Sequence, residues 1–239
     1  MGDRLMDKIY GRKPVIDAID SGVKIYKAFV IKQNSKIVEE IIAKLNKANV
    51  EINFVDKRFF DKIELNHQGV MVEAESFEYK DLRDLDKYQR LIILDQIEDP
   101  HNLGAIIRSA ESFGFDGVII PERRSASVSP IVYKTSAGAI NNINIIMVKN
   151  TNRAIEEIKE AGFWVYGLAG EASSPIDQVD LKGKVCLIVG NEGKGLSRLV
   201  RENCDILINI PMKGFVNSLN ASVASAIAMY EVLRQNGFS

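Results

Sequence analysis

Short apolar runs alternate with helical patterns along the second half of the chain. The runs are continuous and rich in Val, Ile and Leu, and they lie at 91–95, 117–121, 144–148, 163–169, 185–190 and 206–211. Apolar strands separated by helices are typical of a parallel sheet covered by helices on both faces. The pattern therefore predicts an α/β domain with a doubly wound parallel sheet, in which ligands bind beyond the carboxyl ends of the strands.

The first part of the chain predicts a smaller α/β domain. Strand-like runs at 27–31, 51–56 and 69–75 accompany a helical run at 36–49. The segment that follows is dense in charge and poor in aliphatic residues, so it is expected to connect two domains. We therefore expect a small domain at 1–76, a linker at 77–90 and a larger domain at 91–239.

The stretch from Gly214 to Tyr230 carries no charged residue and contains few large apolar ones. A helix that faces water would carry Lys and Glu, and an ordinary core helix would contain more Leu and Ile. Its small residues lie at 221, 222, 224, 225 and 226. They permit a close approach of another backbone, so the stretch predicts either a tightly packed helix or an intimate interface.

Composition places the chain among globular proteins that stay in a reducing cytosol. Hydrophobic residues make up 46% of the 239 residues and charged residues 26%, and no apolar run approaches the ~20 residues of a membrane span. Cys186 and Cys204 have no disulfide or metal spacing. The net charge of -1 gives no overall attraction to nucleic acid, so an RNA partner has to be met by a local patch.

Polar residues follow the strand predicted at 91–95. Asp99 and Pro100 mark a turn, and Asn102 is expected to cap a helix that runs through Arg108 to Phe113. Asn102 then lies at the amino-terminal end of the helix and Arg108 on its second turn. From these positions both side chains can reach one ligand pocket. The simpler alternative is a capped helix with Arg108 as a surface charge.

Glycines at 190, 193 and 195 surround Glu192 after the strand at 185–190. The Walker pattern fails because Leu196 and Ser197 follow the last glycine, and the dinucleotide pattern fails because Arg198 stands where its third glycine is required. The segment is either a plain surface turn or a place where free backbone amides and one carboxylate hold a ligand. Ser218 and Asn220 lie at a later strand-to-helix junction, where such side chains cap a helix or bind a ligand.

Several other chemistries find no support in the sequence. His67 and His101 are the only histidines and no acidic cluster accompanies them, so no metal is expected. A nucleophile elbow is absent, and no basic activator lies near either cysteine. Arg123 and Arg124 follow a strand, either as solvated charge or as a phosphate clamp. A parallel sheet would suit a nicotinamide-dependent oxidoreductase, but the glycine fingerprint of that class is missing.

Three segments taken together resemble, in order, the three motifs of the SpoU family of RNA ribose 2′-O-methyltransferases in the SPOUT superfamily. They read DPHNLGAIIRSAESFGFDGVII, LIVGNEGKGLSRLV and INIPMKGFVNSLNASVASA. The segments YGRKPVIDAI and NHQGVMVEAE are similar to the amino-terminal substrate-binding domain of the RlmB-like and TrmH-like branch, which has the fold of ribosomal protein L30e. The segment RRSASVSPIVYKTSAGA also resembles this branch, so the likeness covers nearly the whole chain.

The resemblance implies a fold that the residue pattern alone does not predict. It implies a small L30e-like α/β domain followed by a Rossmann-like parallel sheet whose carboxyl-terminal segment is threaded into a deep trefoil knot, although knots are rare. It also implies a homodimer, in which the charge-free stretch supplies the threaded loop and the final helix. The loop and the helix are expected to help form the cofactor site and the dimer interface.

The resemblance further implies transfer of a methyl group from S-adenosylmethionine to a ribose 2′-hydroxyl of RNA, without a metal. The residues that match the catalytic positions of the family are Asn102, Arg108, Glu192, Ser218 and Asn220. Those that match the cofactor-binding positions are Leu168, Gly170, Gly190, Asn191, Gly195, Ile210, Met212, Ser218 and Leu219. Candidate RNA-binding residues are Arg12, Arg123, Arg124 and Lys134.

The RlmB-like amino-terminal domain favours a guanosine of large-subunit ribosomal RNA as the target. Related enzymes modify transfer RNA, which stays open as an alternative substrate. An alternative of another class is a non-catalytic RNA-binding protein of the same fold, in which the larger domain only dimerises.

Overall fold

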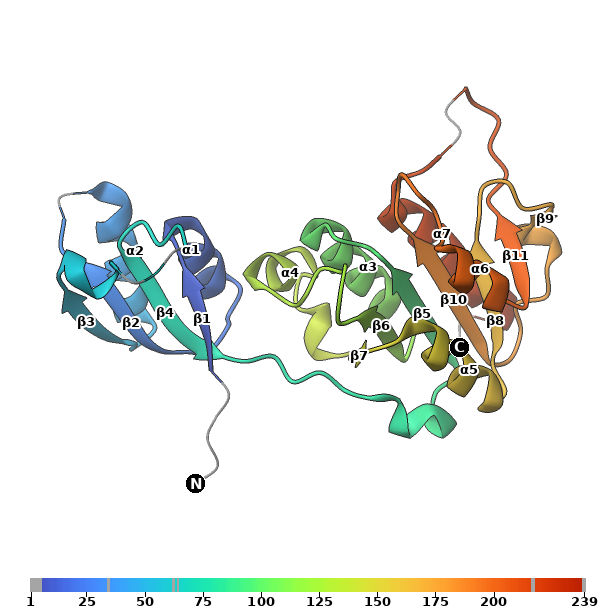
Figure 1. Ribbon diagram of the computed structural model, residues 1–239, viewed down its shortest axis with the longest axis horizontal. Helices are drawn as coiled ribbons and strands as arrows, with labels where there is room; N and C mark the ends of the chain where they lie inside the picture. Colours follow the sequence, from blue (N-terminus) through green and yellow to red (C-terminus); the bar gives the residue numbers. More distant parts are fainter. Residues whose placement is uncertain (1–5, 34, 62, 64, 216–217, 238–239) are drawn as a thin grey trace. The chain divides into compact units, whose positions relative to one another are not determined.

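The computed structural model describes residues 6–33, 35–61, 63, 65–215 and 218–237 (Figure 1). These residues form two compact units. One comprises Met1–Glu78 together with Val128–Lys134, and the other comprises Tyr79–Ser127 together with Thr135–Ser239. Within the described residues, no helix is long and apolar enough to cross a membrane.

The first unit is a four-stranded sheet with strand order β1-β4-β2-β3. Its elements are β1 (Met6–Tyr10), α1 (Arg12–Asp20), β2 (Ile25–Ile31), α2 (Lys36–Lys47), β3 (Glu51–Val55), the 3-10 helix η1 (Lys57–Phe59) and β4 (Val70–Glu75). The core lies between the sheet and the two helices, where Val30 and Val72 pack with Val15 and Ile41. The helix and strands expected here are confirmed, whereas β1 was missed because charged residues interrupt its apolar pattern.

Residues Val128–Lys134 join this unit although they lie far away in the sequence. They include most of helix α4 (Pro130–Thr135). The Lys134 ammonium forms an ion pair of 2.9 Å with Asp17, and the ring of Tyr133 packs edge-on against Phe77.

The second unit is a seven-stranded parallel sheet with strand order β7-β6-β5-β10-β8-β11-β9. Its strands are β5 (Arg90–Asp95), β6 (Gly117–Pro121), β7 (Asn144–Val148), β8 (Trp164–Leu168), β9 (Ser174–Pro175), β10 (Val185–Gly190) and β11 (Ile206–Asn209). Its helices are η2 (Leu82–Lys87), α3 (Pro100–Ser112), η3 (Ala139–Asn141), α5 (Thr151–Glu160), η4 (Ile176–Gln178), α6 (Arg198–Asn203) and α7 (Ala221–Asn236). All six strands expected from the apolar runs are confirmed, and the two-residue β9 was missed.

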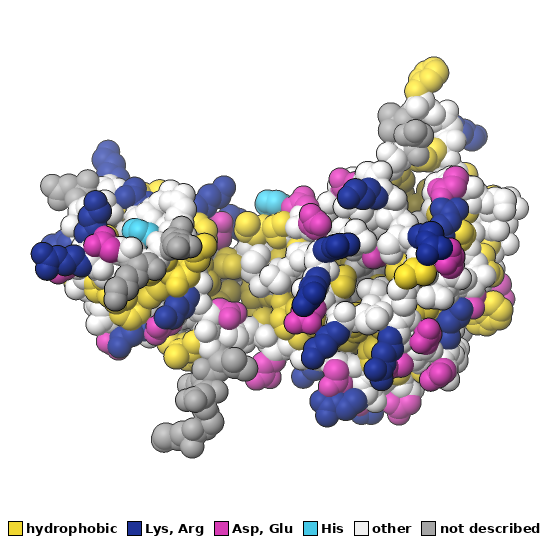
Figure 2. All heavy atoms as spheres, viewed as in Figure 1, with side chains coloured by type: hydrophobic (Ala, Val, Ile, Leu, Met, Phe, Trp, Pro, Cys, Tyr) yellow, Lys and Arg dark blue, Asp and Glu magenta, His cyan; other side chains and the backbone are white. Residues whose placement is uncertain are grey.

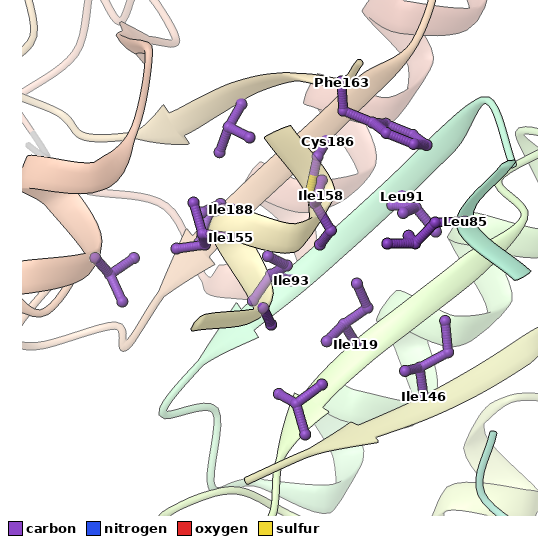
Figure 3. Close-up of a cluster of buried hydrophobic side chains, with 14 of the residues drawn as sticks. Leu85, Leu91, Ile93, Ile119, Ile146, Ile155, Ile158, Phe163, Cys186 and Ile188 are labelled. Atoms are coloured by element: carbon purple, nitrogen blue, oxygen red, sulfur yellow. The ribbon is translucent and has the colours of Figure 1, made fainter. Parts of the chain in front are cut away.

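Helices cover both faces of this sheet. On one face Ile93 and Ile188 pack against Ile155 and Ile158 of α5 (Figure 3). On the other face α3 and α7 contact each other, and they contact β6 and β10 respectively. The burial of both faces explains why the strands are continuously apolar, as the sequence indicated. The fold is therefore the expected α/β architecture, while the threading of a trefoil knot stays a prediction.

One local feature differs from the expectation. The helix after β5 begins at Pro100, and its N-cap is Asp99, whose carboxylate accepts a hydrogen bond of 2.9 Å from the backbone N–H of His101. The assignment of Asn102 as the cap is therefore wrong. An Asp before a Pro is a strong helix start, because the Pro at the first position has no N–H that needs a partner. Within the segment 77–90, Lys80 bridges to Ile146, and Leu85 joins the core of the second unit.

Candidate active site

The segments singled out after β5 and β10 lie side by side. These two strands are neighbours, and Gly190 at the end of β10 is in register with Asp95 at the end of β5. The side-chain amide of Asn191 donates a hydrogen bond of 3.1 Å to the carbonyl of Gln96, and the buried carboxylate of Asp95 accepts one of 2.7 Å from the backbone N–H of Ser197. Here the strand order also reverses direction, since β5, β6 and β7 lie to one side and β8 to the other. Ligands of parallel sheets bind at such points.

Three candidate catalytic residues meet in one hydrogen-bonded cluster. The Asn102 amide donates to Oε1 of Glu192 at 2.8 Å, and the Asn220 amide donates to Oδ1 of Asn102 at 3.0 Å. The Asn220 amide also donates to Oε1 of Glu192. Asn102 is 9% exposed, so its polar groups need these partners. The cluster joins residues that are 90 and 118 positions apart in the chain.

Asn220 also begins the last helix. Its Oδ1 accepts hydrogen bonds from the backbone N–H groups of Ser222 at 2.9 Å and Val223 at 3.3 Å, which makes it the N-cap of α7. The backbone N–H of Ala221 donates to Oε1 of Glu192 at 3.2 Å. The Glu192 carboxylate therefore lies at the positive end of the α7 dipole, where negative charge is stabilised. The sequence-based assignment of Asn220 to a cap or to a ligand site is confirmed as to the cap.

Two of the candidate catalytic side chains have charged atoms without a partner among the described residues. Oε2 of Glu192 forms no hydrogen bond with any residue in the described part of the chain, although Oε1 accepts three. Arg108 is exposed, and its guanidinium has neither a hydrogen bond nor an ion pair with the described residues. The structure thus joins Asn102, Glu192 and Asn220, but it does not bond Arg108 to them. Ser218 is exposed and lines the cavity described next.

A cavity of about 540 Å³ opens beside the cluster. All nine residues that were expected to bind a cofactor line it, namely Leu168, Gly170, Gly190, Asn191, Gly195, Ile210, Met212, Ser218 and Leu219. Glu192 lines it as well. The volume lies within the range of small-molecule sites. The ends of β8, β10 and β11 therefore contribute to one cavity, as the strand-end rule predicts.

The turn at Gly190 brings two stretches of backbone into contact. A Cβ atom at Gly190 would lie 2.3 Å from both the carbonyl carbon and the oxygen of Gly195. Backbone hydrogen bonds of 3.1 and 2.8 Å join Asn191 and Gly195 in both directions, and Oδ1 of Asn191 accepts from the N–H of Gly193 at 3.0 Å. The glycine at position 190 is thus required by the close approach of backbone, and the turn holds Glu192 at the rim of the cavity.

Sequence reasoning missed several residues that line the cavity. Among them Glu171 follows β8, Asn209 ends β11, and Arg201 lies on α6. Arg201 forms an ion pair with Glu171. The strand-end rule could have indicated Glu171 and Asn209, but no local pattern distinguishes Arg201 from its charged neighbours.

The four candidate RNA-binding residues differ in their surroundings. The Nε of Arg12 donates to the carbonyl of Gln68 at 3.3 Å, and Lys134 is paired with Asp17. The Asp17 carboxylate raises the pKa of Lys134 through a hydrogen bond. Arg123 and Arg124 are exposed and have no partner among the described residues. Free basic side chains thus follow β6, whereas Lys134 serves the packing of the first unit.

No group of three or more His, Cys, Asp and Glu side chains in the described residues could hold a metal ion. Neither cysteine is activated, because burial raises the pKa of the Cys186 thiol and raises that of Cys204 to about 12.

Comparison with known proteins gives matches along the whole length of this fold. The profile of the SpoU rRNA methylase family matches residues 89–230, and that of RNA 2'-O ribose methyltransferase substrate binding matches residues 8–80. The putative TrmH family tRNA/rRNA methyltransferase YacO of Bacillus subtilis is 39% identical over 238 residues, which cover 96% of each chain. A putative TrmH family tRNA/rRNA methyltransferase of Staphylococcus saprophyticus is 41% identical over 241 residues, again with 96% of each chain covered.

Solved structures share the fold. The rRNA methyltransferase of Sinorhizobium meliloti with bound S-adenosylmethionine superimposes with a TM-score of 0.65 at 29% identity, over 96% of this chain and 87% of that one. The SpoU methyltransferase AviRb of Streptomyces viridochromogenes, in complex with the same cofactor, gives a TM-score of 0.65 at 24% identity, over 96% and 90% of the two chains.

The two roles of Asn220 can be separated by substitution. Asn220→Ala removes both the cap and the bonds to Asn102 and Glu192, so it should lower the free energy of unfolding by about 1–2 kcal/mol. Asn220→Ser retains a capping oxygen and should cost less than about 1 kcal/mol. Urea unfolding of the two variants measures the difference. Equal losses would show that the cap contributes little and that the cluster dominates.

Proposed function

The chain belongs to the SpoU rRNA methylase family, and from that premise we propose that it methylates a ribose 2′-hydroxyl of a guanosine in large-subunit ribosomal RNA. Family membership makes it a tRNA/rRNA methyltransferase that uses S-adenosylmethionine. The proposal adds the atom and the nucleotide. The observation that carries it is the cluster of Asn102, Glu192 and Asn220 at the rim of a cofactor-sized cavity.

The residues around the cavity fit S-adenosylmethionine. The walls alternate between apolar side chains, such as Leu168 and Ile210, and polar ones. Oδ1 of Asn209 is a buried acceptor without a donor among the described residues, while its amide donates to the carbonyl of Ala172 at 2.6 Å. A purine ring with an exocyclic amine offers both an apolar face and such a donor. The backbone around Gly190, Ile210 and Leu219 is assigned to hold the adenosine.

When bound, S-adenosylmethionine supplies a methyl group that its sulfonium has already activated. The protein then has to orient the acceptor ribose and to allow its 2′-hydroxyl to lose a proton as the oxygen is methylated. Arg108 carries a guanidinium that stays protonated and accepts no proton in water. Its exposed guanidinium has no partner among the described residues, and its planar set of donors suits a phosphate of the RNA or the developing alkoxide. We therefore assign Arg108 to bind and stabilise the acceptor.

Glu192 offers the free acceptor of the cluster, because its Oε2 has no partner among the described residues while Oε1 is held by three donors. This oxygen is placed to accept a hydrogen bond from a substrate hydroxyl. Asn102 and Asn220 are positioning residues, since they act by holding Oε1. Ser218, exposed at the cavity, completes the polar rim.

Transfer RNA is the second candidate substrate. The names of the relatives in Bacillus and Staphylococcus include both tRNA and rRNA. The ribosomal choice rests on the resemblance of residues 8–80 to the substrate-binding domain.

A labelling experiment tests the proposed function. The purified protein is incubated with tritiated S-adenosylmethionine and, separately, with ribosomal RNA and transfer RNA made without modifications, and the labelled ribose is then mapped. We expect label at the 2′-oxygen of one large-subunit guanosine. Label on transfer RNA alone would keep the chemistry and overturn the substrate. If neither free RNA is labelled, assembly intermediates of the large subunit are the next substrates to test.

Arg108→Ala should remove methylation and leave the cofactor site intact. Because Arg108 does not line the cavity, calorimetric binding of S-adenosylmethionine should stay near the wild-type affinity. The single-turnover transfer rate should fall by at least ~100-fold, as for loss of one donor that stabilises developing negative charge. Arg153→Ala is the control, since Arg153 is an exposed arginine on α5 that pairs with Glu157. Equal loss of binding and transfer would show that Arg108 is structural.

We also propose that the protein is a homodimer that buries one face of α7. Val223, Ile227 and Tyr230 recur at helical spacing, and they are 46%, 39% and 48% exposed. Phe113, the C-cap of α3, packs edge-on against Tyr230 with ring centroids 5.8 Å apart. A large apolar stripe on the surface of a helix is typical of an interface.

Ile227→Lys should convert the dimer into a monomer, because it places a charge in the centre of this stripe. Light scattering coupled to size-exclusion chromatography measures the mass. Leu199→Lys is the matched control, since Leu199 is an apolar residue of α6 that is 51% exposed and lies outside the stripe. An unchanged mass for Ile227→Lys, or a wild-type mass equal to that of one chain, would contradict the proposed interface.

A further inference from the structure

One end of the sheet in the first unit gathers segments that are distant in the sequence. Strands β1 and β2 both pair antiparallel with β4, and β2 pairs parallel with β3. The carboxyl ends of β1, β2 and β3 therefore lie at the same edge as the start of β4. Backbone hydrogen bonds of 3.0 Å from Gly11 to Val70 and of 2.8 Å from Ile31 to Gly69 join the segments there.

Basic side chains at this edge lack hydrogen-bond and ion-pair partners in the described part of the chain. The residues concerned are Lys13 on α1, Lys36 at the start of α2, and Lys57 and Arg58 on η1. All four are exposed, and none forms a hydrogen bond or an ion pair with the described residues. Lys32, after β2, is exposed too, and its ammonium lies 6.0 Å from the ring centre of Phe54.

The opposite end of the same sheet is different. Lys24 and Lys27, at the start of β2, pair with Glu75 at 3.9 Å and Glu51 at 3.2 Å. Lys44, in the second half of α2, pairs with Asp20 and Glu40. The unit therefore pairs Lys24, Lys27 and Lys44 internally at one end, and it leaves the four basic residues named above at the other end for an external anion.

Two aromatic side chains lie exposed among the unpaired cations. Phe54 at the end of β3 is 55% exposed, and Phe59 on η1 is 41% exposed. Phe59 is held in place by Phe29, on which it stacks with ring centroids 4.9 Å apart. A phenylalanine ring that is fixed on one face and exposed on the other can stack on a nucleobase, and neighbouring cations can follow the phosphates.

We propose that this edge, the basic face, binds a single-stranded segment of the RNA substrate. It comprises Lys13, Lys32, Lys36, Phe54, Lys57, Arg58 and Phe59. RNA as the substrate class rests on the proposed function, whereas the face itself follows from the unpaired charges and exposed rings. Helices α1 and α2 both begin at this edge, so their positive ends add to the attraction for phosphate.

Figure 2 shows Lys and Arg side chains gathered along the upper edge of the first unit, which lies at the left of the view. In the described part of these segments, the negative charges are those of Asp56 and Asp61 and, on the first turn of α2, that of Glu39. An acidic peptide would find the same cations, but it carries no flat bases to cover Phe54 and Phe59. The combination of rings and cations therefore favours RNA.

The test compares two full-length variants of equal charge. The first is Lys32→Gln/Lys57→Gln/Arg58→Gln on the basic face. The control is Lys24→Gln/Lys27→Gln/Lys47→Gln, which removes three positive charges at the other end of the unit. Binding is measured by fluorescence anisotropy with a labelled oligouridylate RNA of about twelve nucleotides, a length within the range of single-strand sites, at several salt concentrations.

The basic-face variant should bind at least ~10-fold more weakly, and the slope of log affinity against log salt should decrease by about 2, since each phosphate contact contributes ~0.7 for a single strand. The control should retain the wild-type slope. Phe54→Leu, which keeps an apolar side chain but removes the ring, should weaken binding roughly fivefold with little change in the slope. Thermal unfolding checks that all variants are folded.

Methyl transfer separates this inference from the proposed function. With a labelled substrate in hand, the basic-face variant should raise KM and leave kcat nearly unchanged, because the face lies outside the candidate active site. Equal weakening by both triple variants, or no weakening by either, would overturn the basic face. Failure of the wild-type protein to methylate any RNA would overturn the proposed function, while the anisotropy result would still decide whether this face binds RNA.

Discussion

The carboxylate of Glu192 ties together the three chain segments from which the candidate active site is built. Its Oε1 accepts hydrogen bonds from Asn102 on α3, from Asn220 before α7, and from the backbone N–H of Ala221. Hydrogen bonds to a charged group are among the stronger ones in proteins, at about 1.5–3 kcal/mol each. The carboxylate can collect them only because Gly190 lets the backbone of the turn approach Gly195 closely. One tight turn thus holds, beside the cavity, the carboxylate that joins α3 to the start of α7.

The two oxygens of the Glu192 carboxylate have different roles in this arrangement. Oε1 is committed to structure, whereas Oε2 and the guanidinium of Arg108 are uncommitted among the described residues. A group without an internal partner can bind a substrate without breaking a bond inside the protein, whereas an oxygen that three donors hold is fixed in position. Candidate catalytic residues cannot be told apart by their motif positions, but their hydrogen bonds distinguish the positioning residues from those that are available to a substrate.

The basic residues of the first unit also fall into two groups, those that are paired with carboxylates and those that are not paired with any described residue. The chain has a net charge of -1, which gives no indication of an RNA partner. In the first unit, however, Lys24, Lys27 and Lys44 are neutralised by carboxylates, whereas Lys13, Lys36, Lys57 and Arg58 at the other end of the sheet pair with no carboxylate among the described residues. Attraction for an anion depends on local imbalance within roughly a Debye length of ~10 Å, and the total charge does not measure that imbalance.

The sequence by itself determined the strands of the larger sheet, because strands buried on both faces have to be continuously apolar. It also determined that polar residues follow those strands, and the nine residues at the cofactor-binding motif positions, of which Asn191 and Ser218 have polar side chains, line the cavity. Local signals failed where the competing choice was also local, as with Asp99 and Asn102 at the start of α3. Only the tertiary structure decided that Arg201, Glu171 and Asn209 share the cavity, that Oε2 of Glu192 is the free oxygen, and which lysines are paired. These properties depend on contacts between residues far apart in the chain, and such contacts leave no periodic pattern in the sequence.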